Sequence, residues 1–173
     1  ILSAAATATN QNAWIDAMKT QFEKYPDMKL VDIVYGNDDP TTATQVTQGL
    51  LQQYPNLKGI ISPTTVGIAA AAAVLDTPKY RGKIALTGLG TPDSLKKYVS
   101  DGTIKEFVLW KPNDLGYLAG YAAVQVASGK LNGSQGQKFT AGKLGSFTVG
   151  ADKTVLLGPP FVFTSDNINQ FDF

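Results

Sequence analysis

The sequence predicts an α/β fold in which a doubly wound parallel sheet has helices on both faces, followed by a β-rich tail. Short apolar runs alternate with segments of helical period as far as Gly129. This alternation is typical of a parallel sheet that is buried on both faces. The links are short, so the crossovers are expected to be right-handed.

The first elements are a strand, a helix and a strand. Residues 1–4 and 30–35 are apolar runs of strand length. The helix between them is predicted from large apolar residues at helical spacing: Trp14, Ile15, Met18, Phe22 and Tyr25. Because residues 1–4 resemble the second half of a buried strand, we expect a chain cut from a larger protein; the alternative is a mature terminus after processing.

The next helix begins at Asp39-Pro40, with Asp39 as cap and Pro40 in the first helical position. It ends at Tyr54-Pro55. The residues expected on its buried face are Val46, Leu50, Leu51 and Tyr54. Residues 58–62 form the third predicted strand, and residues 67–75 an Ala-rich helix thin enough to pack close to a sheet.

Residues 83–88 are the fourth strand and residues 103–110 the fifth. Thr91-Pro92 repeats the cap-then-proline start of a helix. The inward side chains of that helix are predicted to be Leu95, Tyr98 and Val99. A last long helix, from Asn113 to Ser128, is closed by Gly129. Its apolar stripe consists of Leu115, Leu118, Ala119, Ala122 and Val126.

The tail after Gly129 has no helical period. Residues 130–145 are rich in Gly, Ser, Lys and Gln, and β-type runs follow at 146–149, 154–157 and 161–163. We expect hairpins and crossing segments here.

Composition excludes several classes of function. The 15 basic and 14 acidic residues nearly cancel, so no net field favours nucleic acid. Without Cys or His, the chain lacks thiol nucleophiles, Ser-His triads and the usual zinc ligands. Carboxylates cluster only at Asp38-Asp39, so we expect no metal, no cofactor and no catalytic residues, although carboxylate or Lys chemistry stays open.

Polar residues follow each predicted strand, and parallel sheets bind ligands beyond the carboxyl ends of their strands. These residues are amides, hydroxyls, a few carboxylates and an indole. Amides both donate and accept, as sugar hydroxyls do, and an indole covers the apolar face of a pyranose. The set favours a neutral polyol. The predicted ligand-binding residues are Asn10, Gln11, Trp14, Asp39, Pro63, Thr64, Thr65, Leu89 and Trp110.

Structural alternatives exist for most of these residues. Asn10 and Asn12 are candidate caps of the first helix, and Thr64-Thr65 of the third. Asp39 is expected to be a cap before it is a ligand group. Trp14 lies on the same stripe as Met18 and Phe22, which favours core packing. Two alternatives stand for Trp110: a role in ligand binding or at the hinge, or a role in core packing.

Long ordered stretches resemble the type I periplasmic binding proteins, in the branch with rhamnose-binding proteins and furanosyl autoinducer receptors. They are ATATNQNAWIDAMK, YGNDDPTTATQVTQGLLQQYPNLKGIISPTTVGIAAAA, LTGLGTPDSLKKYVSDGTIKEFVLWKPNDLGYLAGY and LLGPPFVFTSDNINQFDF. The resemblance implies a two-lobed protein whose amino-terminal lobe is missing here. Residues 1–110 would form the second lobe, and residues 111–173 the crossover helix and hinge segments that complete the first.

The resemblance also implies that Asn10-Gln11 contacts ligand. The autoinducer receptors usually have Asp-Gln there and Pro-Asp-Ala after the third strand, where this chain has Pro63-Thr64-Thr65. Both departures remove carboxylates and argue against the autoinducer. Relatives for pentoses and hexoses often have an acidic residue at the position of Leu89. An apolar Leu89 suits the methyl group of a 6-deoxy sugar such as rhamnose.

The function expected from this resemblance is solute binding for an ABC sugar importer, in the periplasm or at the surface of a one-membrane bacterium. The expected partners are a monosaccharide, the importer's membrane subunits, and either the missing lobe or a second copy through the Asn113-Ser128 helix. The chief alternative is the effector-binding domain of a sugar-responsive transcription regulator. An α/β enzyme fragment using Asp38 and Asp39, or a fragment without activity, are further alternatives.

Overall fold

The computed structural model describes all residues 1–173, and the chain divides into two compact units. Unit 1 comprises Ile1–Leu109 and Val162–Phe173, and unit 2 comprises Trp110–Phe161. The sequence placed the first boundary at residue 110 but grouped the whole of residues 111–173 together. The final residues instead join unit 1. The assignment of these units to lobes of a larger protein stays a prediction.

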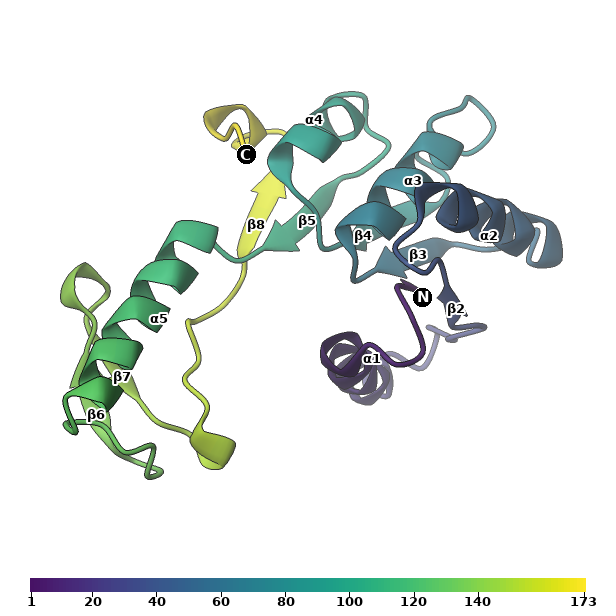
Figure 1. Cartoon of the computed structure of the whole chain (residues 1–173). Helices are drawn as coiled ribbons and strands as arrows, with labels where there is room; N and C mark the ends of the chain where they lie inside the picture. The colour runs from purple at the N-terminus through teal and green to yellow at the C-terminus, as the bar shows by residue number, and fades with distance from the viewer. The chain divides into compact units, whose positions relative to one another are not determined.

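Unit 1 is built on a predominantly parallel sheet (Figure 1). Its strands are paired as β2 (Val34–Tyr35) with β1 (Leu2–Ser3), β3 (Gly59–Ser62) with β4 (Ala85–Gly88), and β5 (Glu106–Leu109) with β8 (Phe161–Thr164). The pairs β1–β2 and β3–β4 are parallel. Ser62 Oγ donates to Leu2 O at 2.8 Å and joins β3 to β1. A parallel bridge between Leu89 and Val108 joins β4 to β5.

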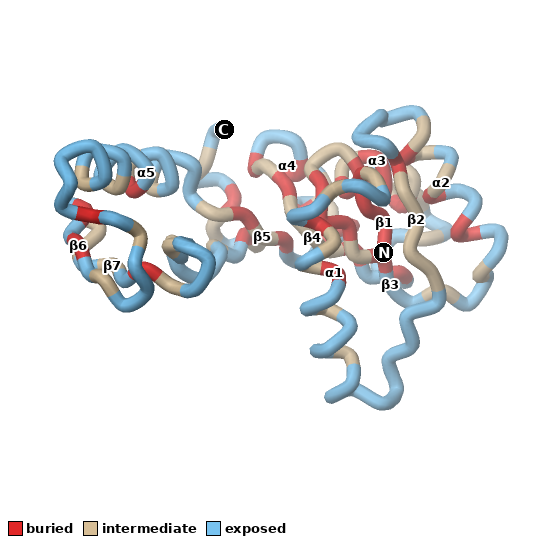
Figure 2. Tube along the Cα trace, turned by 60° about the horizontal axis from the view of Figure 1, so that its bottom comes forward, coloured by how far each residue is buried: buried red, intermediate tan, exposed pale blue.

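Helices lie on both faces of this sheet, as predicted. α2 (Pro40–Gln53), α3 (Thr65–Leu75) and α4 (Pro92–Ser100) cover one face, and α1 (Thr9–Phe22) lies on the other (Figure 1). Buried residues concentrate on the strands and on α3 (Figure 2). The largest fully buried side chains of unit 1 include Leu2, Ile68, Leu75, Leu95, Ile104, Phe107, Phe163 and Ile168.

The return of the final residues to unit 1 has a clear packing basis. The Phe163 ring on β8 stacks on the Phe107 ring on β5 at a centroid distance of 4.9 Å. Phe171 meets Phe163 edge-to-face at 5.0 Å, and Asp93 N donates to Phe173 O at 3.2 Å. Aromatic burial of this size dominates the local energetics.

The second predicted strand is shorter than expected. Only Val34 and Tyr35 pair with β1, and Leu30 and Val31 are 38% and 49% exposed. The pairing includes two further bonds, from Val34 N to Ile1 O and from Ile1 N to Asp32 O.

The apolar side chains of α1 are less buried than their helical spacing predicts. Ile15 is buried, but Trp14, Met18 and Phe22 are only half-buried. Tyr25 lies beyond the helix end and is 50% exposed, so its prediction as an inward residue is wrong. The helix ends at Phe22, so the helical spacing does not extend to Tyr25.

Unit 2 consists of α5 (Pro112–Ala127) and an antiparallel hairpin of β6 (Lys138–Thr140) and β7 (Ser146–Thr148). Gly129 ends α5 with a positive φ of 70°, as predicted. The unit has its own small core: Leu118, Leu131, Phe139, Ala141 and Val149. The predicted β-type run at 154–157 is not a strand; Leu156 is 83% exposed, while Val155 and Leu157 pack against this core instead.

Only Leu118 of α5 is buried. Leu115, Val124 and Val126 are 43%, 66% and 55% exposed. A Cβ atom added at Gly116 or Gly120 would meet nothing within 4 Å. Part of the predicted apolar stripe is therefore uncovered within the chain. None of the helices has the length and apolar character needed to cross a membrane.

Candidate functional site

Gln11 is the best-anchored of the predicted ligand residues. It lies in the first turns of α1, and its carbonyl oxygen accepts from Ser3 Oγ at 2.7 Å and from Ala4 N at 2.8 Å. Gln11 is 8% exposed, and both donors belong to buried residues. The two bonds orient the amide, and its Nε2 group makes no hydrogen bond within the chain. Gln11 therefore presents a donor of fixed position just beyond the carboxyl end of β1.

Thr64 is held by a residue from another strand end. Its hydroxyl donates to Asp38 Oδ1, which follows β2. Thr64 occupies the N-cap position of α3 and is 6% exposed, but its side chain does not cap the helix. Thr64 is thus the N-cap residue by position, as the structural alternative expected, but its hydroxyl is used by Asp38 and makes no capping bond.

Asp39 is a helix cap, as expected. Its Oδ1 accepts from Thr42 N and from Thr42 Oγ1, both at 2.7 Å. These bonds from the Thr42 hydroxyl and amide hold the pKa of the Asp39 carboxyl below its usual value. Pro40 begins α2 with its ring at the first helical position. A ligand role for Asp39 stays a prediction.

The other predicted residues lie at the same edge of the sheet, with one exception. Pro63 is buried, Thr65 begins α3, and Leu89 N donates to Ser62 O at 2.9 Å. Asn10 is exposed on the first turn of α1, and Trp14 is half-buried one turn later. Trp110 is the exception: it is half-buried and is the first residue of unit 2.

The predicted caps of the first helix are not caps. The N-cap of α1 is Ala8, without a side-chain hydrogen bond, and Asn10 and Asn12 lie inside the helix. Asn12 Nδ2 instead donates to Ala6 O at 2.9 Å. With the capping alternative removed, no hydrogen bond within the chain accounts for the exposed amide of Asn10.

Asp38 was not among the predicted ligand residues. It is exposed, and it follows Asn37 in an unusual backbone conformation, with φ of 54° at Asn37 and 49° at Asp38. Few non-glycine residues adopt this region, and Asn and Asp tolerate it best. The signal in the sequence was the turn-forming run Gly36-Asn37-Asp38, which follows a strand.

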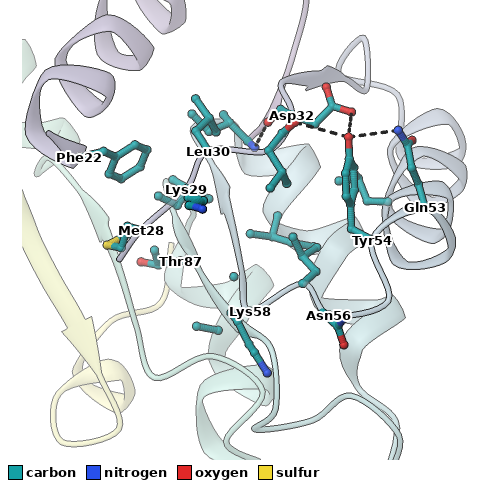
Figure 3. Close-up of a pocket in the computed structure, with 18 of the residues that line it drawn as sticks. Phe22, Met28, Lys29, Leu30, Asp32, Gln53, Tyr54, Asn56, Lys58 and Thr87 are labelled. Carbon is teal, nitrogen blue, oxygen red and sulfur yellow. Dashed lines mark hydrogen bonds between the residues drawn. The ribbon is translucent and has the colours of Figure 1, made fainter. Parts of the chain in front are cut away.

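A cavity of about 630 Å³ lies elsewhere on unit 1 (Figure 3). It opens at the amino ends of β1 and β3, where Ile1, Lys58 and Gly59 line it, and none of the predicted ligand residues contributes. Its wall is largely hydrocarbon, from Phe22, Leu30, Val31, Leu50, Leu57 and Ile61. The Tyr54 hydroxyl is already bonded to Asp32 Oδ2 at 3.1 Å. Such a lining does not suit a polyol.

Comparison with known proteins gives the family. Residues 1–131 match the family model described as periplasmic binding protein domain. The chain belongs to the periplasmic binding proteins. This match supports the doubly wound α/β fold described above and the predicted resemblance. It also establishes a family of binding proteins, not of enzymes.

Three solved structures are particularly similar. A sugar ABC transporter from Actinomyces odontolyticus is 52% identical, with a TM-score of 0.87. An ABC transporter solute-binding protein from Clostridium phytofermentas with bound L-rhamnose is 40% identical, with a TM-score of 0.89. LsrB from Clostridium saccharobutylicum in complex with AI-2 is 28% identical, with a TM-score of 0.83.

These matches cover nearly all of this chain but little more than half of the relatives. The match to the Actinomyces protein spans 99% of this chain and 56% of that protein. The match to the rhamnose-bound protein spans 98% of this chain and 57% of that protein. The whole relative thus contains another portion of similar size.

Proposed function

We propose that this chain is part of the solute-binding component of an ABC sugar importer and supplies one wall of a site for a neutral monosaccharide. The observation that carries the proposal is the anchored Gln11 amide at the carboxyl edge of the sheet, with its donor free. The proposed wall on unit 1 comprises Asn10, Gln11, Trp14, Asp39, Pro63, Thr64, Thr65 and Leu89, and a ligand role for Trp110, in unit 2, stays a separate prediction from the sequence.

L-Rhamnose is the proposed sugar. The 40% identical relative was solved with L-rhamnose bound, whereas the AI-2-bound relative is 28% identical. Leu89 offers an apolar surface to the 6-methyl group. Calorimetry on the two-lobed parent protein with L-rhamnose, D-glucose and D-ribose tests this choice. Equal affinity for all three sugars would contradict it, while a clear preference for L-rhamnose supports it.

The single wall is expected to bind weakly. A micromolar site corresponds to about −8 kcal/mol, and half of its contacts to about −4 kcal/mol, or a millimolar Kd. The actual affinity falls below this, because the entropy lost on capturing the ligand is not halved with the contacts. A micromolar Kd for the isolated chain would refute the view that a second wall is required.

In the intact receptor, we propose that the sugar is enclosed by hinge closure of two lobes. The importer's membrane subunits would then recognise the closed form. The proposed location is the periplasm, or the cell surface in a bacterium with one membrane.

The alternative function is the effector-binding domain of a transcription regulator, which has the same fold. The reading frame of the parent protein distinguishes the importer component from the regulator. A signal peptide supports the importer, and a helix-turn-helix supports the regulator.

The uncovered face of α5 is proposed as an association surface. Leu115, Val124 and Val126 are exposed on a helix that buries only Leu118. Apolar patches of this kind usually mark an interface. The proposed occupants are the missing first lobe or a second copy of this chain. Light scattering at high protein concentration tests the second: Leu115→Lys and Val126→Lys together should reduce self-association, and a wild-type monomer at all concentrations would exclude it.

A further inference from the structure

The adjacent carboxylates of Asp38 and Asp39 are used differently. Asp39 caps α2 through two bonds from Thr42, so its Oδ1 is occupied. Asp38 takes no part in that cap. It accepts one bond, from the buried Thr64 hydroxyl, and its Oδ2 has no partner within the chain. The chain therefore positions one carboxylate for α2 and presents the other at the edge of the sheet.

The backbone supports this presentation. Asn37 and Asp38 both lie in the left-handed region, with φ of 54° and 49°. The conformation is fixed by Asn37 N, which donates to Ala4 O at 2.6 Å. It carries the chain past the end of β1 before α2 begins. This places Asp38 within reach of the Thr64 hydroxyl, which belongs to the loop after β3.

A second, independent group points to a ligand at the same place. Ala4, which accepts from Asn37, donates its own N–H to Gln11 Oε1 at 2.8 Å. Gln11 is 8% exposed, yet its Nε2 group has no partner within the chain. The amide is thus held by its oxygen, and its donor is left for solvent or a ligand. Ala4, the residue after β1, thus fixes both the Gln11 side chain, which has an open donor, and the loop of Asp38, which has an open acceptor.

We propose that Asp38 is the ligand carboxylate of this wall and that Thr64 is its positioning residue. The inference rests on the proposed function and deepens it. Each sugar hydroxyl donates and accepts, so a fixed amide donor and a fixed carboxylate acceptor match two hydroxyls of one monosaccharide. A carboxylate in this place also selects for neutral sugars, because it repels the carboxylate of a uronic acid.

Matched variants in an NMR titration test this assignment. The ¹⁵N-labelled chain is titrated with L-rhamnose to about 0.2 M, which covers millimolar and weaker affinities. Asp38→Asn keeps the backbone conformation and the contact from Thr64 but removes the charged acceptor. As a control, Asp16→Asn removes the same charge from an exposed side chain of α1 that pairs with Lys19 and is not a proposed wall residue. Thr64→Val removes the positioning hydroxyl, and Thr64→Ser restores it.

We expect Asp38→Asn to weaken binding about tenfold or more, as for loss of a charge-assisted hydrogen bond. Asp16→Asn should stay within about twofold of wild type. Thr64→Val should weaken binding, and Thr64→Ser should recover it. Wild-type affinity in Asp38→Asn, with L-rhamnose still bound, would overturn this assignment alone. If the wild-type chain alone shows no saturable shift, the same variants are compared in the two-lobed parent protein, where absence of L-rhamnose binding would overturn the proposed sugar wall as well.

Discussion

Replacement of Gln11 by Met is the most informative test of how the sheet edge is built. The substitution keeps the length and shape of the side chain but removes the oxygen that accepts from Ser3 Oγ and Ala4 N. Ser3 is 0% exposed and Ala4 is 5% exposed. Both donors would be left buried without a partner, because water does not reach them.

The expected cost follows from these two donors. An unpaired buried donor costs about 1–3 kcal/mol, so Gln11→Met should lower the free energy of unfolding by about 2–4 kcal/mol. Water entry around the new side chain would bring the result toward the lower end. The measurement is urea unfolding followed by far-ultraviolet circular dichroism, with the slope m compared between variants.

Two controls isolate the cause. Asn12→Met removes an amide one residue away, whose bond to Ala6 O is exposed, and should cost less than about 1 kcal/mol. Gln11→Glu keeps an acceptor and should be more stable than Gln11→Met, but it lacks the amide donor and should bind sugar poorly. A Gln11→Met variant within about 0.5 kcal/mol of wild type would refute the anchoring argument.

Three further predictions concern the fold. Gly88→Ala should lower the free energy of unfolding by at least about 3 kcal/mol, because φ is 150° there and a Cβ atom would lie 1.9 Å from Ser62 O. The control Gly59→Ala should be tolerated, since the nearest atom to its Cβ is 3.6 Å away, and equal unfolding midpoints for the two variants would contradict this prediction. Phe107→Ala should cost about 3–5 kcal/mol in chemical denaturation, since the ring is 0% exposed and stacked on Phe163, and an effect below about 1 kcal/mol would argue against the docking of β8. The pKa of Asp39 is lowered in the folded chain, so the stabilising effect of this carboxylate is present above the usual pKa of 3.8 and is lost as the pH falls through the lower folded pKa. The difference in Tm between wild type and Asp39→Ala should therefore shrink on acidification, and a pH-independent difference would count against the cap.

The main elements of the fold were accessible from sequence because local patterns determined them. The Asp39-Pro40 helix start and the Gly129 helix end depend on backbone rules that act within a few residues, and both are confirmed. The extent of the second strand was not accessible. It depends on Ile1, about thirty residues away, which supplies the backbone partner for Val34.

The candidate site was only partly accessible for a similar reason. Sequence reasoning placed Gln11 and Thr64 at the sheet edge from the positions of the strand ends. It missed Asp38, because the use of the two neighbouring carboxylates is decided by Thr42 and Thr64, which lie at different distances along the chain. The return of Phe163 to unit 1 likewise depends on a ring contact with Phe107.

The central claim is that the sugar wall lies at the carboxyl edge of the sheet and not in the hydrocarbon-lined cavity. The most direct test is a map of amide chemical shifts in the labelled wild-type chain on addition of L-rhamnose. We predict that the largest shifts fall at residues 10–11, 37–38, 64–65 and 89. Shifts confined to residues 28–31 and 57–61, around the cavity, would contradict it.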